Sequence, residues 1–355
     1  MAKHLTDISI GKFLLGEGKP PFLIAEMSGN HNQSLERALQ IVESAAKSGA
    51  HAVKLQTYTA DHMTLKSDAQ DFKILDKESL WSGKNLHDLY QEACTPFEWH
   101  APLMKRAQAF GMVCFSSPFD PAAVDFLEDL QVPCYKIASF ELTYFPLLKK
   151  IAQTRKPVIL STGMATEEEI QESIEYLTSH GCSQLILLKC TSTYPASPES
   201  TNIVTIPDMR NKFNVHVGLS DHTLGSATSV ASVAFGAVAI EKHFTLRRAD
   251  GGVDSAFSME PEEFLQLSKD VTQAHLSLGK VTYGPQNERE KKSCSFRRSI
   301  YVSSDIKQGE TLTEKNLKCV RPAFGLPTKN YEMVLGKKAK RSLSFGSPLT
   351  AEDFE

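Results

Sequence analysis

The run V-G-L-S-D-H-T-L-G, residues 217–225, begins as an apolar strand and ends in a group of polar side chains. A second run, A-V-A-I-E-K-H-F at residues 237–244, follows the same pattern. Each run carries one histidine near its polar end, at His222 and His243. Side chains alternate between the two faces of a strand. Ser220 is therefore expected to share a face with His222, and Glu241 with His243, while Asp221 and Lys242 point the other way.

Six similar apolar runs precede these two, and they begin at Phe22, Ala52, Val113, Cys134, Pro157 and Leu185. Their length and their content of Val, Ile and Leu are typical of strands that are buried on both faces. With the runs that begin at Val215 and Ala237 they predict eight strands.

Helix-like segments separate the strands. One begins after Asn32 or Ser34 and stops at Gly49, and another is opened by Thr166 and closed by Gly181. Eight strands that alternate with helices predict an α/β protein with a (β/α)8 TIM barrel. An open doubly wound sheet is the alternative, but the chain has no G-x-G-x-x-G motif to favour it.

The chain is predicted to divide into three parts. Residues 1–280 form the barrel, residues 281–296 a linker, and residues 297–355 a small β-rich domain that packs on a barrel of its own or of a partner chain. The spacing from Thr59 to His100 is too long for one connection, so it predicts an insertion over the barrel mouth that acts as a lid or binds substrate.

Bulk composition excludes several classes of protein. The 355 residues carry a formal net charge of -3 and no basic block, which disfavours a nucleic-acid surface. No apolar stretch is long enough to cross a membrane. The N-terminal ten residues lack the apolar region of a signal peptide, and the seven cysteines form no C-x-x-C pair, so we expect a cytoplasmic protein with reduced thiols.

The two histidines at the ends of neighbouring strands predict a metal site at the barrel mouth. Two imidazoles without a cysteine suit a labile divalent ion that keeps water in its open positions. A structural role in hydrogen bonding is the alternative for His222 and His243. Asp221 and Glu241 either orient the imidazole rings or form structural ion pairs.

Two lysines, Lys54 and Lys136, lie at or near the ends of the second and fourth strands. A buried ammonium needs an anion, so these lysines and the strand-end serines predict a donor-rich pocket for a small phosphorylated acid. Ion pairing with Glu26, Glu141 or Glu241 is the alternative. A Schiff-base aldolase that uses one of the lysines is a further alternative.

Longer strings around these residues resemble the sialic acid synthase family. In the barrel they are I-A-E-M-S-G-N-H, V-K-L-Q-T-Y, F-S-S-P-F, Y-K-I-A-S-F-E, L-S-T-G-M-A-T-E-E-E, L-K-C-T-S-T-Y-P, V-G-L-S-D-H-T-L-G and I-E-K-H-F. The tail D-I-K-Q-G-E-T-L-T-E-K-N-L-K-C-V-R-P resembles the family's C-terminal antifreeze-like (SAF) domain. Three details, F-S-S-P-F, A-S-F-E and T-S-T-Y-P, resemble the pseudaminic acid synthase branch more than the N-acetylneuraminate or legionaminic acid branches.

The resemblance implies condensation of phosphoenolpyruvate with an amino-sugar aldehyde, 2,4-diacetamido-2,4,6-trideoxy-L-altrose, with release of phosphate. It implies that His222 and His243 bind Mn2+, or alternatively Mg2+ or Co2+. The residues implied to hold phosphoenolpyruvate are Lys54, Ser117, Lys136, Ser139, Ser161, Ser192 and Ser220. Ser192 stands where neuraminate enzymes have asparagine. Those implied to face the sugar are Glu141, Tyr194 and Asp254, with Arg321 arriving from the second subunit of a domain-swapped homodimer.

The implied mechanism breaks a C–O bond. The enol carbon attacks the aldehyde, water adds to the carbon that bears phosphate, and the resulting intermediate expels phosphate. We expect Glu26 to handle the proton, with an ion pair to Lys54 as its alternative role. A non-catalytic carbohydrate-binding or ice-binding protein is the remaining hypothesis, and only the antifreeze-like tail favours it.

Overall fold

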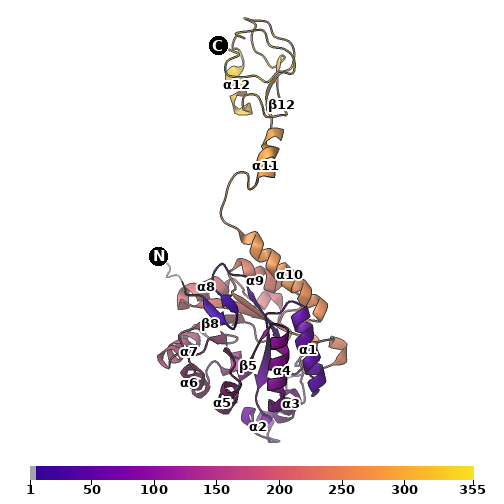
Figure 1. Ribbon diagram of the computed structural model, residues 1–355, viewed down its shortest axis with the longest axis vertical. Coiled ribbons are helices and arrows are strands. Elements are labelled where there is room, and N and C mark those ends of the chain that lie inside the picture. Colours follow the sequence, from indigo (N-terminus) through magenta and orange to yellow (C-terminus); the bar gives the residue numbers. More distant parts are fainter. Residues whose placement is uncertain (1–4) are drawn as a thin grey trace. The chain divides into compact units, whose positions relative to one another are not determined.

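The computed structural model describes residues 5–355 and divides into two compact units, one ending at Gly279 and the other spanning Lys280–Glu355 (Figure 1). The first four residues of the N-terminal segment used to predict cellular location lie outside the described part. No helix in residues 5–355 is both long and apolar enough to span a bilayer.

Eight parallel strands of the first unit close into a barrel in the order β10-β3-β4-β5-β6-β7-β8-β9, which confirms the predicted fold. The strands begin at, or within two residues of, the predicted positions. Their bounds are β3 Phe22–Glu26, β4 Ala52–Thr57, β5 Val113–Pro118, β6 Tyr135–Ile137, β7 Val158–Ser161, β8 Leu185–Cys190, β9 His216–Asp221 and β10 Ala239–His243.

Helices cover the outside of the barrel (Figure 1). They are α1 Leu35–Lys47, α4 Phe97–Ala109, α5 Pro121–Asp129, α6 Phe145–Gln153, α7 Glu167–Ser179, α8 Thr205–Phe213, α9 Ala227–Ala234 and α10 Pro261–Leu278. Short 3-10 turns lie in the connections at Ser139–Glu141, Pro198–Ser200, Arg248–Asp250 and Ser255–Phe257. The helices pack their apolar faces on the outer faces of the strands, so both faces of the sheet are buried.

Local chemistry sets the helix ends as the sequence predicts. The Ser34 side chain accepts a hydrogen bond from the Arg37 N–H at the start of α1, which decides between the two predicted caps. Thr166 and Glu169 form a reciprocal capping box at the start of α7. Gly49 and Gly181 follow these helices with positive φ angles, which only glycine adopts without strain.

A short hairpin that the sequence analysis did not predict packs at the amino end of the barrel. Its strands are β1 Ile8–Ile10 and β2 Phe13–Leu15. Ile8, Ile10 and Leu15 are buried in one apolar cluster with the inward-facing residues at the amino half of the strands. The hairpin thus closes this end of the barrel, and the carboxyl end is left for a site.

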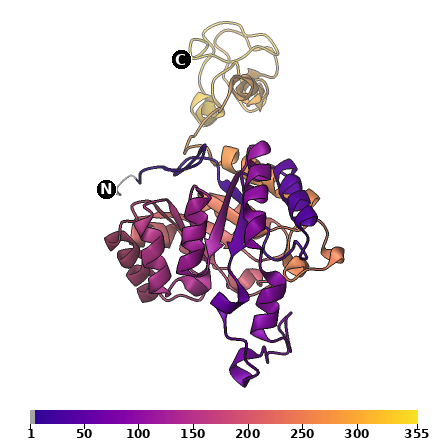
Figure 2. The same cartoon turned by 60° about the horizontal axis from the view of Figure 1, so that its bottom comes forward.

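The predicted insertion lies between β4 and α4. It contains α2 Ala60–Met63, a 3-10 turn at Gln70–Phe72 and α3 Leu86–Ala93. Figure 2 shows this segment, coloured purple, projecting from one end of the barrel. Since it leaves from the carboxyl end of β4, it belongs to the face on which barrel enzymes carry their active sites.

The second unit has a small core of its own. It contains α11 Glu288–Ser293, a 3-10 turn at Cys294–Phe296, β11 Ser299–Val302, β12 Leu317–Val320, a 3-10 turn at Thr328–Asn330 and α12 Tyr331–Val334. β11 and β12 pair antiparallel, as the two β-like runs of the tail predict. The segment assigned to the linker therefore carries a short helix.

Candidate active site

The two histidines meet at the carboxyl end of the barrel. β9 and β10 are hydrogen-bonded neighbours, and residues 221 and 242 stand opposite each other in the register. The ring centroids of His222 and His243 are 5.3 Å apart, and both side chains are buried. The predicted alternation holds, since Ser220 donates a hydrogen bond to Glu241 on the same face.

The opposite face of the same two strands carries a buried ion pair. Lys242 Nζ lies 3.1 Å from Asp221 Oδ2 and also donates to the carbonyls of Thr223 and Gly225. Asp221 accepts further hydrogen bonds from Thr223 and from the Ser229 hydroxyl. These contacts fix the turn that carries His222, so Asp221 acts as a structural ion-pair residue on the face opposite the imidazole rings.

Inside the barrel the lysines and glutamates form one buried cluster. Lys54 pairs with Glu26 and lies 3.6 Å from Glu241, whose carboxylate is 3.7 Å from Lys136. All four side chains are buried. Both lysines therefore have anionic partners within the protein, as the ion-pair alternative expects, and Glu241 is one of these partners.

Burial and charge shift the pKa values of this cluster in different directions. Loss of water around Glu26, together with the nearby Glu241, outweighs the effect of Lys54 and raises the pKa of Glu26 to about 7. Burial opposes charge on Lys54, but its two glutamates outweigh burial and raise its pKa. For Lys136 burial prevails and lowers the pKa. One carboxyl group of the cluster is thus poised to gain or lose a proton near neutral pH.

Hydroxyl groups lie on or just after β5, β6, β7 and β8, and one of them contacts the cluster. Ser117 accepts a hydrogen bond from Lys54 Nζ at 3.3 Å, and Ser161 is buried without a hydrogen-bond partner. Ser139 accepts from the Gly163 N–H at 3.0 Å. A Cβ atom at position 163 would lie only 2.0 Å from Ser192 Oγ and 2.8 Å from Ser139 Oγ, so glycine at this position leaves room between the two hydroxyls.

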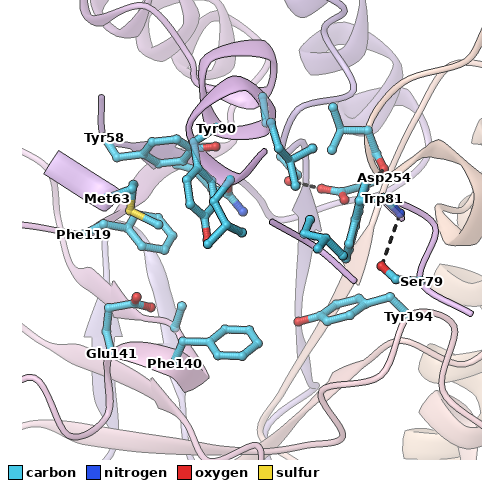
Figure 3. Close-up of a pocket in the computed structure, with 18 of the residues that line it drawn as sticks. Tyr58, Met63, Ser79, Trp81, Tyr90, Phe119, Phe140, Glu141, Tyr194 and Asp254 are labelled. Carbon is cyan, nitrogen blue, oxygen red and sulfur yellow. Dashed lines mark hydrogen bonds between the residues drawn. The ribbon is translucent and has the colours of Figure 1, made fainter. Parts of the chain in front are cut away.

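A cavity of about 470 Å³ lies beside His243, between the barrel end and the insertion (Figure 3). Glu141, Tyr194 and Asp254 line it, as does Gln56. Burial raises the pKa of Glu141 to about 7 and also raises the pKa of Asp254, which accepts a hydrogen bond from Ser28. The Tyr194 ring lies 4.4 Å from the His222 ring, centroid to centroid.

Unpartnered buried polar atoms gather at this end of the barrel. Among the described residues they include Glu141 Oε2, Ser161 Oγ, Glu241 Oε2 and His243 Nδ1. Buried polar atoms in folded proteins are nearly always hydrogen-bonded, so a concentration of unpaired ones indicates a place for a ligand.

The two histidines fit a divalent cation. His222 Nδ1 donates to the Thr191 carbonyl at 2.9 Å, so Nε2 is the nitrogen left to face a ligand. Burial opposes charge on His222, but the Cys190 thiol and the Thr191 carbonyl outweigh burial and raise its pKa, so a bound ion would displace a proton from Nε2. Burial holds the pKa of His243 well below its usual range, so its ring is neutral and can also act as a ligand. No group of three His, Cys, Asp or Glu side chains within residues 5–355 is arranged to hold a metal, so these two rings would leave other coordination positions open.

One predicted residue lies outside the unit that carries this site, so the geometry of the first unit does not test it. Arg321 is an exposed residue of the second unit. Three residues that contact the site were not singled out from the sequence: Gly163, Cys190, whose thiol lies 3.9 Å from His222 Nδ1, and Trp81, which lines the cavity. Their positions at strand ends or in the insertion are the only signals that could have indicated them.

Comparisons with known proteins agree with this architecture. Residues 41–283 match the NeuB family, and residues 297–355 match the SAF domain. The chain is 45% identical to the pseudaminic acid synthase of Campylobacter jejuni, over 98% of this chain and all of the relative. It is 35% identical to the N,N'-diacetyllegionaminic acid synthase of the same species, over 91% of this chain and 97% of the relative. Among solved structures, the N-acetylneuraminic acid synthetase of Leptospira borgpetersenii in complex with citrate matches with a TM-score of 0.72 at 28% identity, over 82% of this chain and 96% of that one.

Proposed function

This chain belongs to the NeuB family, and from that premise we propose that it catalyses the pseudaminic acid synthase reaction. Phosphoenolpyruvate and 2,4-diacetamido-2,4,6-trideoxy-L-altrose condense with one water molecule to give pseudaminic acid and phosphate. The observation that carries the proposal is the meeting of two buried lysines and two buried histidines at one end of the barrel, beside a cavity of sugar size. The 45% identity to a pseudaminic acid synthase supports this acceptor over the legionaminic and neuraminic alternatives.

The lysines would bind the anionic donor. Among the described residues, Lys54 and Lys136 form ion pairs with two carboxylates, Glu26 and Glu241, and the pKa of Glu26 is near neutrality. A bound phosphoenolpyruvate would therefore meet two ammonium groups and the hydroxyls of Ser117, Ser139, Ser161, Ser192 and Ser220. These donors would also stabilise the negative charge of the departing phosphate.

Glu26 would move the proton. The reaction needs a group that accepts a proton when water adds to the carbon bearing phosphate, while the aldehyde oxygen gains a proton and becomes a hydroxyl. A carboxyl group with a pKa near the working pH is suited to this exchange, and the pKa of Glu26 is raised to about 7. Its contact with Lys54 supports this role, because a donor bound by Lys54 would lie next to Glu26.

His222 and His243 would hold the divalent ion, for which we propose Mn2+, with Mg2+ or Co2+ as alternatives. When bound, such an ion polarises the aldehyde oxygen as a Lewis acid. The Thr191 carbonyl orients the His222 ring and burial keeps His243 neutral, whereas the raised pKa of His222 means that the ion would displace a proton from that ring.

We also propose a domain-swapped homodimer in the cytoplasm, in which Arg321 of one chain reaches the sugar bound by the other. An exposed arginine suits this role because its guanidinium has several donors for hydroxyl and acetamido oxygens.

Parallel reactions test the proposed function. Phosphoenolpyruvate is offered with the altrose-type acceptor, a bacillosamine-like acceptor or N-acetylmannosamine; phosphate release is measured, and the products are identified by mass spectrometry. We expect the nonulosonate from the altrose-type acceptor, with activity lost on EDTA treatment and in His222→Ala but kept in His275→Ala, a change on the outer helix α10. Turnover that survives complete metal removal and His222→Ala would refute the metal-dependent mechanism.

The Schiff-base alternative needs a neutral lysine. The pKa of Lys54 is raised, which makes it a poor nucleophile, whereas the pKa of Lys136 is lowered. Borohydride treatment in the presence of a keto acid tests both side chains together. We expect no covalent adduct, and an adduct on Lys136 would instead establish the aldolase. Binding of sugar without any turnover would favour the carbohydrate-binding hypothesis.

A further inference from the structure

The cavity beside His243 has one wall that the proposed mechanism does not use. It is formed by the insertion between β4 and α4, and we name it the insertion wall. Its members are Met63, Ile74, Trp81, Leu86, Leu89 and Tyr90. We propose that the insertion wall is the specificity determinant that selects deoxygenated, acetamido-bearing acceptors over fully hydroxylated ones. This inference rests on the proposed function.

The insertion wall is mostly apolar, and both N–H groups of Trp81 are engaged in hydrogen bonds within the protein. The Trp81 indole N–H donates to the Val253 carbonyl at 3.0 Å, and the Ser79 hydroxyl accepts from the Trp81 backbone N–H at 3.2 Å. Figure 3 shows Trp81 and Tyr90 turned into the cavity. No charged residue of the insertion is among the described residues that line the cavity, and the polar groups that the insertion adds there are the Trp81 indole and the hydroxyls of Tyr58, Ser79 and Tyr90.

The barrel side of the cavity carries polar as well as apolar residues. The polar ones include His243, Asp254, Glu141 and Gln56, which come from the barrel strands and the loops that follow them, and Phe119, Phe140 and Val253 lie among them. The aldehyde carbon must lie on this side, because the donor lysines and the histidines are there. The remainder of the acceptor then extends toward the insertion wall.

The position of the insertion wall is fixed by contacts within the first unit. The Trp81 hydrogen bond joins it to the loop that carries Asp254, and the Tyr58 ring packs edge-on against both Tyr90 and Phe119. A fixed apolar surface discriminates better than a mobile one, since it cannot rearrange to hydrate an unwanted group.

The chemistry of the acceptor matches this surface. In a 2,4-diacetamido-2,4,6-trideoxy sugar the carbon farthest from the aldehyde is a methyl group, and the two acetyl groups add two more methyls. N-acetylmannosamine instead carries a hydroxyl on the carbon farthest from the aldehyde and another in place of the 4-acetamido group. An apolar pocket rejects an added hydroxyl only by leaving it without a partner, which limits discrimination to roughly 100-fold. The insertion wall would thus select the trideoxy class without setting its stereochemistry.

The test is the ratio of kcat/KM values for the altrose-type acceptor and N-acetylmannosamine, measured by phosphate release. Native protein is expected to favour the altrose-type acceptor by roughly 10- to 100-fold. Leu86→Gln places a hydrogen-bonding amide in the insertion wall and is expected to reduce this ratio about tenfold, as is the milder Ile74→Thr. Leu80→Gln is the matched control, because Leu80 belongs to the same insertion, is 50% exposed and does not line the cavity.

The ratio cancels any loss of folded protein, since both acceptors are measured on the same sample. A ratio that stays at the native value in both Leu86→Gln and Ile74→Thr would overturn the inference while leaving the proposed function intact. An equal reduction in Leu80→Gln would also overturn it, because the effect would not belong to the insertion wall. Absence of phosphate release with every acceptor would overturn the proposed function and this inference with it.

Discussion

Replacing His100 with glutamine should make the free energy of unfolding of the barrel less sensitive to acid. His100 is fully buried on α4. Its Nδ1 faces the Pro96 carbonyl at 3.2 Å, which can only accept, so Nδ1 carries the proton and Nε2 accepts from Thr57 Oγ1 at 2.8 Å. The Thr57 hydroxyl in turn lies 2.6 Å from Ser116 Oγ, so the neutral ring supports the carboxyl ends of β4 and β5.

The direction of the pKa shift of His100 determines whether stability rises or falls with pH. Burial lowers the pKa of His100 to about 4, whereas an unfolded histidine titrates near 6.5. Between these pH values His100 is protonated in the unfolded chain and neutral in the folded one. The contribution of the neutral ring to stability is therefore fully present above pH 6.5 and is lost as the pH falls toward 4. At about 1.36 kcal/mol per pH unit, the loss is about 2 kcal/mol at pH 5 and about 3.4 kcal/mol well below pH 4.

The assay is urea unfolding at pH 8, 7, 6 and 5, followed by fluorescence of the neighbouring Trp99. Between pH 8 and pH 5 the native protein should lose about 2 kcal/mol more stability than His100→Gln. Losses from His51, whose pKa is also lowered by burial, are common to both proteins and cancel. The loss from His31, whose pKa is lowered to about 4 by burial and in part by His100, becomes slightly smaller in His100→Gln. His275→Gln, on the outer helix α10, should follow the native curve. If the free energy of unfolding falls equally with pH in native protein and in His100→Gln, the reasoning is refuted.

Three further experiments test the site and the strands that carry it. Gly163→Ala should raise the KM for phosphoenolpyruvate at least tenfold with little effect on melting temperature, because its Cβ would lie 2.0 Å from Ser192 Oγ; an unchanged KM would mean that the hydroxyls do not bind the donor. Lys242→Met should lower the free energy of unfolding by about 3–5 kcal/mol in urea titrations, since it leaves a buried carboxylate unpaired, and a loss below 1 kcal/mol would contradict that account. His222→Ala and Arg321→Ala should each be inactive alone but recover activity when unfolded together and refolded as mixed dimers. Failure to recover any activity would count against the domain swap.

Local patterns in the sequence determined the barrel and the face that carries its site. Eight apolar runs separated by capped helices leave few other arrangements, and parallel strands bring their polar ends to one edge. The alternation of side chains was enough to place His222 and His243 on one face and Lys242 on the other. These inferences succeed because they depend on periodicity within a few residues of chain.

The tertiary structure alone decided which charges pair and where the cavity is closed. The sequence left Lys54 and Lys136 with three candidate glutamates, and only closure of the barrel set Glu26 and Glu241 as their partners. The three-residue strands of the N-terminal hairpin are too short to give a periodic signal, and Trp81 meets Val253 across 172 residues of chain. Such contacts depend on loop conformations and on packing between distant segments, which no local pattern encodes.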